Sequence, residues 1–195
     1  MPITTSQVIA VGASTGGTEA LRDFLSQLSP QIPGLLIVQH MPEAFIRAFA
    51  ARLDELCSIK VQEAVHGMPI LPGNAYIAPG HSHLLLEKSG NMYRTVLSQS
   101  PPFNRHRPSV DVLFKAMAKI VGKQAVGILL TGMGKDGAAG LLEMKQAGSY
   151  NFAQNEDTCI VFGMPKEAIA LGAVDEVVSI KDLAGRVTLH CQRMG

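Results

Sequence analysis

Short apolar runs alternate with stretches of helical periodicity along most of the chain, and this alternation restricts the fold more than any other feature. The first cycle has strands at residues 7–11 and 35–39 and amphipathic helices at 18–28 and 43–56. The pattern resumes with helices at 110–121 and 138–147, strands at 125–130, 150–154 and 177–179, a helix from Pro165 to residue 171, and a C-terminal helix. Strands separated by helices form parallel sheets covered on both faces. We therefore predict an α/β protein with a doubly wound, mostly parallel sheet of the Rossmann-like kind.

The middle of the chain departs from this pattern. Residues 60–64 and 75–78 have strand character, and two further runs at 83–88 and 93–97 are joined across a short turn at 89–91. We predict an antiparallel hairpin excursion here and hence a mixed sheet. A polar loop containing prolines follows at 98–109.

Composition and charge limit the possible functions. The 195 residues suffice for one well-buried domain, and we expect a single domain over residues 1–195. Lys and Arg number 17 against 16 Asp and Glu, which gives no reason to expect a nucleic acid partner. No apolar run approaches the ~20 residues that a membrane helix needs, and the three cysteines lack the spacing of a zinc site. We predict a cytoplasmic protein with buried thiols, without membrane insertion and without a cofactor.

Ser14 is a candidate nucleophile, because it lies in the glycine-rich turn GASTGG directly after the first strand. This turn fits neither a dinucleotide-binding loop, which has glycine where Ser14 stands, nor a P-loop, which has Lys followed by Ser or Thr after its last glycine. It does match the GxSxG pattern of hydrolase nucleophile turns. A serine reacts at neutral pH only with a base beside it, so the hypothesis needs further residues.

His40 and Asp136 are the expected partners of Ser14. His40 directly follows the second strand, and Asp136 lies in the glycine-rich loop after the strand at 125–130. Loops at the carboxyl ends of parallel strands emerge at one edge of the sheet, so we expect the three side chains to meet there. The chain order Ser, His, Asp differs from that of α/β-hydrolases. Amides of the turns at 15–17 and 132–134 are candidate donors to an oxyanion.

Each of these candidate residues also has a simpler, structural interpretation. Ser14 and Asp136 could cap the helices that follow them, and His40 could be a structural histidine at a strand end. His81 and His83 suggest a metal site, but no carboxylate or cysteine completes the set, so we predict none.

Seven segments together resemble the catalytic domain of the bacterial chemotaxis protein-glutamate methylesterases, the CheB family. The resemblance extends over residues 8–178. The segments are GASTGGTEA (12–20), QHMP (39–42), YIAPG (76–80), NRHRPSVD (104–111), TGMGKDG (131–137), AQNE (153–156) and FGMP (162–165).

The resemblance implies a serine hydrolase with the triad Ser14, His40 and Asp136, and supporting or oxyanion roles for Thr15 and Met133. It implies hydrolysis of glutamate γ-methyl esters on the cytoplasmic helices of methyl-accepting chemoreceptors, with release of methanol, and deamidation of receptor glutamines. Members of the family commonly carry an N-terminal receiver domain that restrains the esterase, which this sequence lacks, so we expect constitutive activity.

Three questions stay open at the level of sequence. Arg105 and Arg107 either bind acidic groups that flank the methylation site or pair with local carboxylates. The chain could instead be a non-catalytic binding domain whose glycine-rich turns hold an anion or a protein. It could also be a serine esterase or amidase with another substrate.

Overall fold

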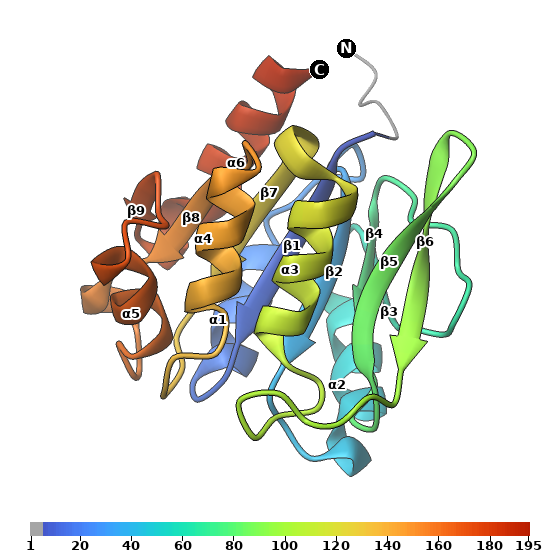
Figure 1. Ribbon diagram of the computed structural model, residues 1–195, viewed down its shortest axis with the longest axis horizontal. Coiled ribbons are helices and arrows are strands. Elements are labelled where there is room, and N and C mark those ends of the chain that lie inside the picture. The colour runs from blue at the N-terminus through green and yellow to red at the C-terminus, as the bar shows by residue number, and fades with distance from the viewer. Residues whose placement is uncertain (1–5) are drawn as a thin grey trace.

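The computed structural model describes residues 6–195 and has a central sheet between two layers of helices (Figure 1). In chain order its elements are β1 (Val8–Ala13), α1 (Gly17–Leu25), β2 (Gly34–Gln39), α2 (Glu43–Leu56), β3 (Lys60–Glu63), β4 (Asn74–Ile77), β5 (His83–Ser89), β6 (Met92–Ser98), α3 (Val110–Ile120), η1 (Gly122–Gln124), β7 (Ala125–Leu129), α4 (Ala138–Gln146), β8 (Tyr150–Gln154), η2 (Glu156–Thr158), α5 (Met164–Ala170), β9 (Glu176–Val178) and α6 (Ile180–Met194). Every predicted helix and strand occurs, with some ends shifted by a few residues.

The large sheet has the strand order β3-β4-β2-β1-β7-β8-β9, and all of its strand pairs are parallel. The chain leaves β1 toward β2 on one side and later returns to β7 on the other. The order therefore reverses between β1 and β7. Such a switch point opens a crevice at the carboxyl ends of the strands, where ligands of doubly wound sheets bind.

Both faces of the sheet are buried, and alternate side chains of one strand supply the two cores. In β1, Ile9 and Val11 pack with residues of α1, α2 and α6, whereas Val8 and Ala10 pack with residues of α3, α4 and α5. This explains why the strands are continuous apolar runs.

The antiparallel hairpin is present, but it does not join the large sheet. Strands β5 and β6 pair with each other as a separate two-stranded sheet, and among residues 6–195 neither pairs with a strand of the large sheet. An isolated antiparallel bridge joins Arg94 of β6 to Pro69. Leu84, Leu86 and Tyr93 of the hairpin belong to the same core as α3, and β5 lies beside that helix (Figure 1). The predicted fold class is confirmed, but the prediction of a mixed sheet was wrong: the hairpin acts as part of the covering layer.

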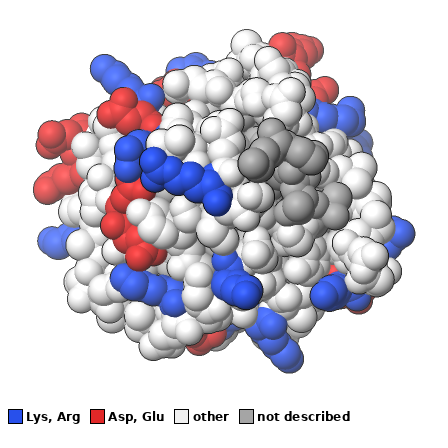
Figure 2. All heavy atoms as spheres, turned by 90° about the horizontal axis from the view of Figure 1, so that it is seen from above, with Lys and Arg blue, Asp and Glu red and all other residues white. Residues whose placement is uncertain are grey.

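The loops after β1, β2 and β7 gather at one end of the molecule, and the beginning of β1 and the C-terminus lie at the opposite end (Figure 1). Figure 2 views the latter end, where acidic and basic side chains are interspersed and form no patch of one sign. Within residues 6–195, none of the helices has the length and apolar character needed to cross a bilayer.

Candidate active site

The pairing of β1 with β2 brings Ser14 and His40 together. The last paired residues of the two strands are Ala13 and Gln39, and the amide of His40 donates to the carbonyl of Ala13 (3.0 Å). Ala13 and Gln39 lie against Gly17 at the start of α1. Because side chains alternate along a strand, Ser14 and His40 face the opposite side of the sheet, where α3 begins.

Several contacts hold the backbone of Ser14 in place. Its amide donates to the carbonyl of Thr131 (3.0 Å), and its carbonyl accepts from the side-chain amide of Gln39 (2.9 Å). A Cβ at Gly132 would lie 2.8 Å from Cβ of Ser14, so the turn after β7 approaches the serine this closely only with glycine there. Ser14 does not cap α1, since Gly16 occupies the cap position without any side-chain hydrogen bond.

Asp136 is a buried carboxylate that lies at the N-terminus of α3. Its side chain is 2% exposed and accepts five hydrogen bonds. The donors are His40 Nε2 (2.8 Å), Ser109 Oγ (2.8 Å), the amides of Val110 (2.8 Å) and Asp111 (3.1 Å), and Asn104 Nδ2 (3.1 Å). A helix N-terminus favours an anion, because its first amides have no partner within the helix. The negative charge of Asp136 therefore compensates the partial positive charge at the N-terminus of α3. Asp136 does not cap α4, because Gly137 occupies the cap position of that helix.

These donors keep Asp136 ionised. Burial alone raises the pKa of a carboxyl group, but the hydrogen bonds from His40 and from the amides of Asp111 and Val110 outweigh burial and hold the pKa of Asp136 at about 2. A carboxylate that is charged at neutral pH and lies next to an imidazole fixes the ring proton on the nitrogen that faces it and stabilises the imidazolium.

His40 is oriented so that one ring nitrogen is left for proton transfer. Its side chain is 8% exposed, and Nε2 lies 2.8 Å from Oδ2 of Asp136. Since Nε2 carries the proton that is donated to Asp136, Nδ1 is the basic nitrogen. Nδ1 is buried and has no hydrogen-bond partner among residues 6–195. Such a nitrogen can accept a proton from a hydroxyl on the neighbouring strand end.

The structure thus joins His40 to Asp136 and places Ser14 on the adjacent strand end. Within the described part of the chain, no hydrogen bond links the hydroxyl of Ser14 to His40. In structures without substrate such bonds are often long and shorten when substrate binds.

His106 is a site residue that the sequence did not single out as such. Its ring stacks on that of His40, with the centroids 3.7 Å apart and an angle of 6° between the planes. Burial and the nearby His40 lower the pKa of His106, although the charge of Asp136 opposes them, so the uncharged form of the ring is favoured. The signals in the sequence were the polar loop that carries it and the segment NRHRPSVD (104–111), which resembles the CheB family.

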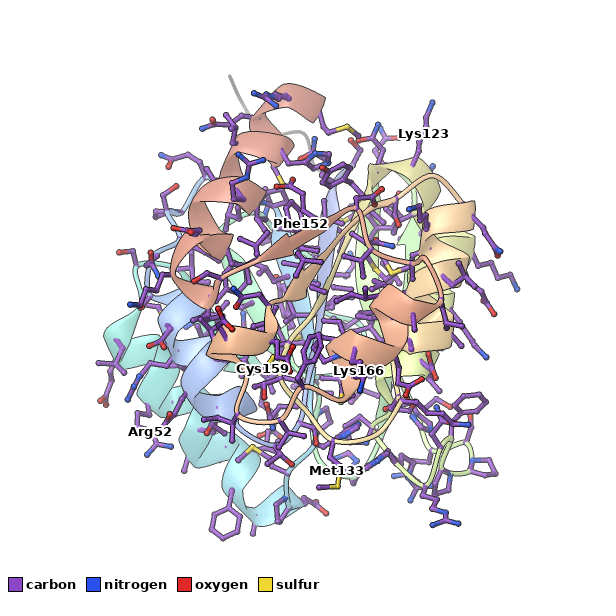
Figure 3. The ribbon with its side chains drawn as sticks, turned by 90° about the vertical axis from the view of Figure 1, so that its left-hand side faces the viewer. Arg52, Lys123, Met133, Phe152, Cys159 and Lys166 are labelled. Atoms are coloured by element: carbon purple, nitrogen blue, oxygen red, sulfur yellow. The ribbon has the colours of Figure 1, made fainter. Side chains whose placement is uncertain are left out.

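Thr15 and Met133 belong to the two turns that flank Ser14. Both side chains are exposed, Met133 by 67%, and Figure 3 shows Met133 at the loop end of the molecule, opposite Lys123. The amides of Gly17 and Gly132 are already bonded to carbonyls, which removes two of the predicted oxyanion donors. The amides of Thr15 and Met133 have no acceptor within residues 6–195.

A family model described as CheB methylesterase matches residues 9–187 of this chain. The chain belongs to the CheB methylesterase family.

Curated relatives agree with this assignment. A protein from Thiobacillus denitrificans is 65% identical over 187 residues, and one from Nitrosomonas europaea is 64% identical over 185 residues. Both are named protein-glutamate methylesterase/protein-glutamine glutaminase. Each alignment covers 95% of this chain but 52% of the relative, so the chain spans about half the length of these proteins.

A solved structure confirms the fold. The crystal structure of the Thermotoga maritima CheB methylesterase catalytic domain superposes with a TM-score of 0.91 at 36% sequence identity. The match covers 93% of this chain and 96% of that one. The parallel sheet with its separate hairpin is therefore the fold of CheB catalytic domains.

The two arginines of the polar loop have different surroundings. Nη1 of Arg107 donates to the carbonyls of Gln99 (3.1 Å) and Ser100 (3.3 Å), which makes Arg107 part of the loop's own structure. Arg105 lines a cavity of about 450 Å³ next to the site, together with Asn104, His106, Met133, Gly134, Lys135 and Asp136. Neither arginine forms an ion pair within residues 6–195.

His83 has a structural role. It is 1% exposed, its Nε2 lies 3.0 Å from the carbonyl of Pro101, and its Nδ1 accepts from the amide of Ser109 (3.1 Å). His81 Nδ1 lies 2.7 Å from the hydroxyl of Ser82. Across residues 6–195, no group of three or more His, Cys, Asp or Glu side chains is arranged to hold a metal ion.

Proposed function

We propose that this chain is a serine hydrolase that demethylates glutamate γ-methyl esters on chemoreceptors and deamidates receptor glutamines to glutamate. The observation that carries the proposal is the buried pair of His40 and Asp136 beside Ser14, at the switch point of the sheet. The names of the relatives support the substrate. The partners are the cytoplasmic helices of methyl-accepting chemoreceptors, and the protein acts in the cytoplasm.

The reaction begins with attack by the serine oxygen. Oγ of Ser14 adds to the side-chain carbonyl carbon of the substrate, and its proton passes to Nδ1 of His40. Asp136 stabilises the imidazolium through the bond at Nε2. The amides of Thr15 and Met133 donate to the negatively charged oxygen, and one such donor contributes about 10²–10³ in rate.

Methanol and ammonia then leave by the same sequence of steps. His40 returns its proton to the departing methanol or ammonia, and the glutamyl group remains on Ser14 as an ester. Water attacks the carbonyl carbon of this ester while His40 accepts a proton from the water. His40 then returns that proton to Oγ of Ser14 as the acyl–oxygen bond breaks, which releases the glutamate carboxylate and restores the serine.

Arg105 is the candidate substrate-binding residue of the polar loop. It lines the cavity beside the site and is exposed, and the one carboxylate among the lining residues, Asp136, already accepts five hydrogen bonds. An acidic residue next to the methylation site of the receptor could therefore pair with the guanidinium of Arg105 without displacing a carboxylate of this protein. Arg107 is bonded to two carbonyls and keeps the loop in shape instead.

The deciding experiment measures methanol released from a methylated receptor fragment by the native chain and by Ser14→Ala. We expect release by the native chain and none by the variant, at equal thermal stability. Absence of release by both proteins would favour a binding domain, and activity on small esters alone would indicate a hydrolase with another substrate.

A second experiment separates the two leaving groups. Ammonia is a poorer leaving group than methanol and depends more on a proton from His40. We therefore expect His40→Gln to lose more deamidation than demethylation, measured on the same receptor fragment. Equal proportional losses would contradict the proposed role of His40 as the acid.

A further inference from the structure

Residues 103–106 form a tight two-residue turn over the candidate site. Phe103 and His106 exchange two backbone hydrogen bonds, each of 2.9 Å, and the central residues Asn104 and Arg105 have φ of 52° and 65°. Positive φ at both central positions is the geometry of type I′ turns, which favour Asn first and Gly second. The two backbone hydrogen bonds therefore define the conformation of the turn and the positions from which its side chains extend.

The side chain of Asn104 links two carboxylates. Its Nδ2 donates to Oδ2 of Asp111 (2.6 Å) and to Oδ1 of Asp136 (3.1 Å). Both aspartates are 2% exposed. Burial and the charge of Asp136 raise the pKa of Asp111, which reflects their mutual repulsion. One amide group with two protons donates to both acceptors and so links the two carboxylates.

The side chain of His106 covers His40. The two rings are nearly parallel, with their centroids 3.7 Å apart, and His106 is half-buried. Rotation of the His40 ring about its side-chain bonds would break this contact together with the bond to Asp136. The stacked ring also keeps water away from one face of the imidazole.

We propose that the turn at 103–106 is a clamp on the pair of His40 and Asp136, in which Asn104 positions the carboxylate and His106 positions the imidazole. Neither residue touches the reacting atoms, so both are positioning residues. The inference that this positioning serves catalysis depends on the proposed function. The positioning itself can be measured without any substrate.

The first test observes the Nε2 proton of His40 by NMR in the full chain. An imidazole proton bonded to a carboxylate resonates far downfield, and its exchange with water reports how often the bond opens. We expect exchange at least about tenfold faster in Asn104→Ala and in His106→Ala, and near the native rate in His106→Phe, which keeps a flat ring. Native exchange rates in both alanine variants would overturn the proposal.

Matched controls come from equivalent residues elsewhere. Asn91 lies in the two-residue turn between β5 and β6, and His66 is an exposed histidine of the segment between β3 and β4. Asn91→Ala and His66→Ala should leave the exchange of the His40 proton unchanged. If Asn104→Ala does not fold, the contrast between His106→Ala and His106→Phe decides the question, and equal exchange in those two variants would refute the clamp.

The second test measures how fast Ser14 reacts with a fluorophosphonate, a general reagent for activated serines. Displaced catalytic groups lose about 10²-fold in rate for ~1 Å of movement, so we expect a loss of at least about tenfold in Asn104→Ala and His106→Ala and recovery in His106→Phe. Faster proton exchange together with native labelling would mean that the clamp exists but does not serve Ser14. No labelling of the native chain, with the NMR result as expected, would contradict the proposed function and leave the clamp standing.

Discussion

Replacement of Asp136 by Asn should reduce stability in a way that depends on pH. The pKa of Asp136 falls from 3.8 to about 2 on folding, although burial opposes the change. At 1.36 kcal/mol for each pKa unit, this difference corresponds to about 2.5 kcal/mol of folding free energy. Because the folded-state pKa is lowered, the contribution is complete above the unfolded pKa and is lost as pH falls through the folded value. About half of it remains at pH 3.

The same Asp136→Asn substitution would also add a cost that does not depend on pH. An amide group has one acceptor oxygen in place of two, so one of the donors at the start of α3 would face an N–H group. An unpaired buried donor costs about 1–3 kcal/mol.

Urea unfolding of the native chain and of Asp136→Asn between pH 3 and pH 5 checks this prediction. We expect the difference in unfolding free energy to grow by about 1 kcal/mol from pH 3 to pH 5. Asp23→Asn is the matched control, since Asp23 is exposed on α1 and should show no such growth. A difference that stays constant across this range would refute the view that the charge of Asp136 stabilises the fold.

Three further predictions concern packing, substrate binding and thiols. Gly12→Ala should lower the unfolding free energy by about 1–3 kcal/mol in urea titrations, because a Cβ there would collide with Val110. Arg105→Gly should raise KM for the receptor fragment several-fold at unchanged kcat. Thermal stability should stay the same or rise, because glycine adopts the positive φ of residue 105 without strain. An unchanged KM would contradict a role of Arg105 in substrate binding. Burial raises the pKa of Cys159 to about 11 and that of Cys191 to about 12, so at pH 8 both should react with a disulfide reagent far more slowly than a free thiol, and rapid labelling of Cys191 would contradict its burial.

The proximity of the candidate site residues that follow strands directly could be predicted from the sequence. Ser14 and His40 each come directly after a strand, so the pairing of β1 with β2 determines their distance. Asp136 lies farther from its strand, near the end of the loop between β7 and α4. That loop begins at the switch point, and the convergence of such loops was enough to expect the carboxylate nearby.

The residues that hold the pair of His40 and Asp136 could not be predicted in the same way. Asn104 and His106 depend on a turn whose second central residue is Arg105, where such turns favour glycine, so the sequence carried no hairpin signal. Gln39 looked like the end of an apolar strand, although its side-chain amide bonds to the carbonyls of both Ser14 and His40.

The position of the hairpin is a second feature that could not be predicted from the sequence. Its turn determines that β5 and β6 pair with each other, but nothing local in the sequence determines whether a hairpin extends the edge of a sheet or covers its face. That choice depends on the fit of Leu84 and Leu86 against α3, which is a property of the packed core.

The capping of α3 by Asp136 has a consequence for engineering. The carboxylate accepts three of its five hydrogen bonds from residues 109–111, at the first turn of that helix. A designer who transplants only the serine, histidine and aspartate into another scaffold would leave the acid without these donors, exposed to protonation and free to rotate. Any portable unit must therefore include, besides the three side chains, the opening turn of a helix aimed at the acid.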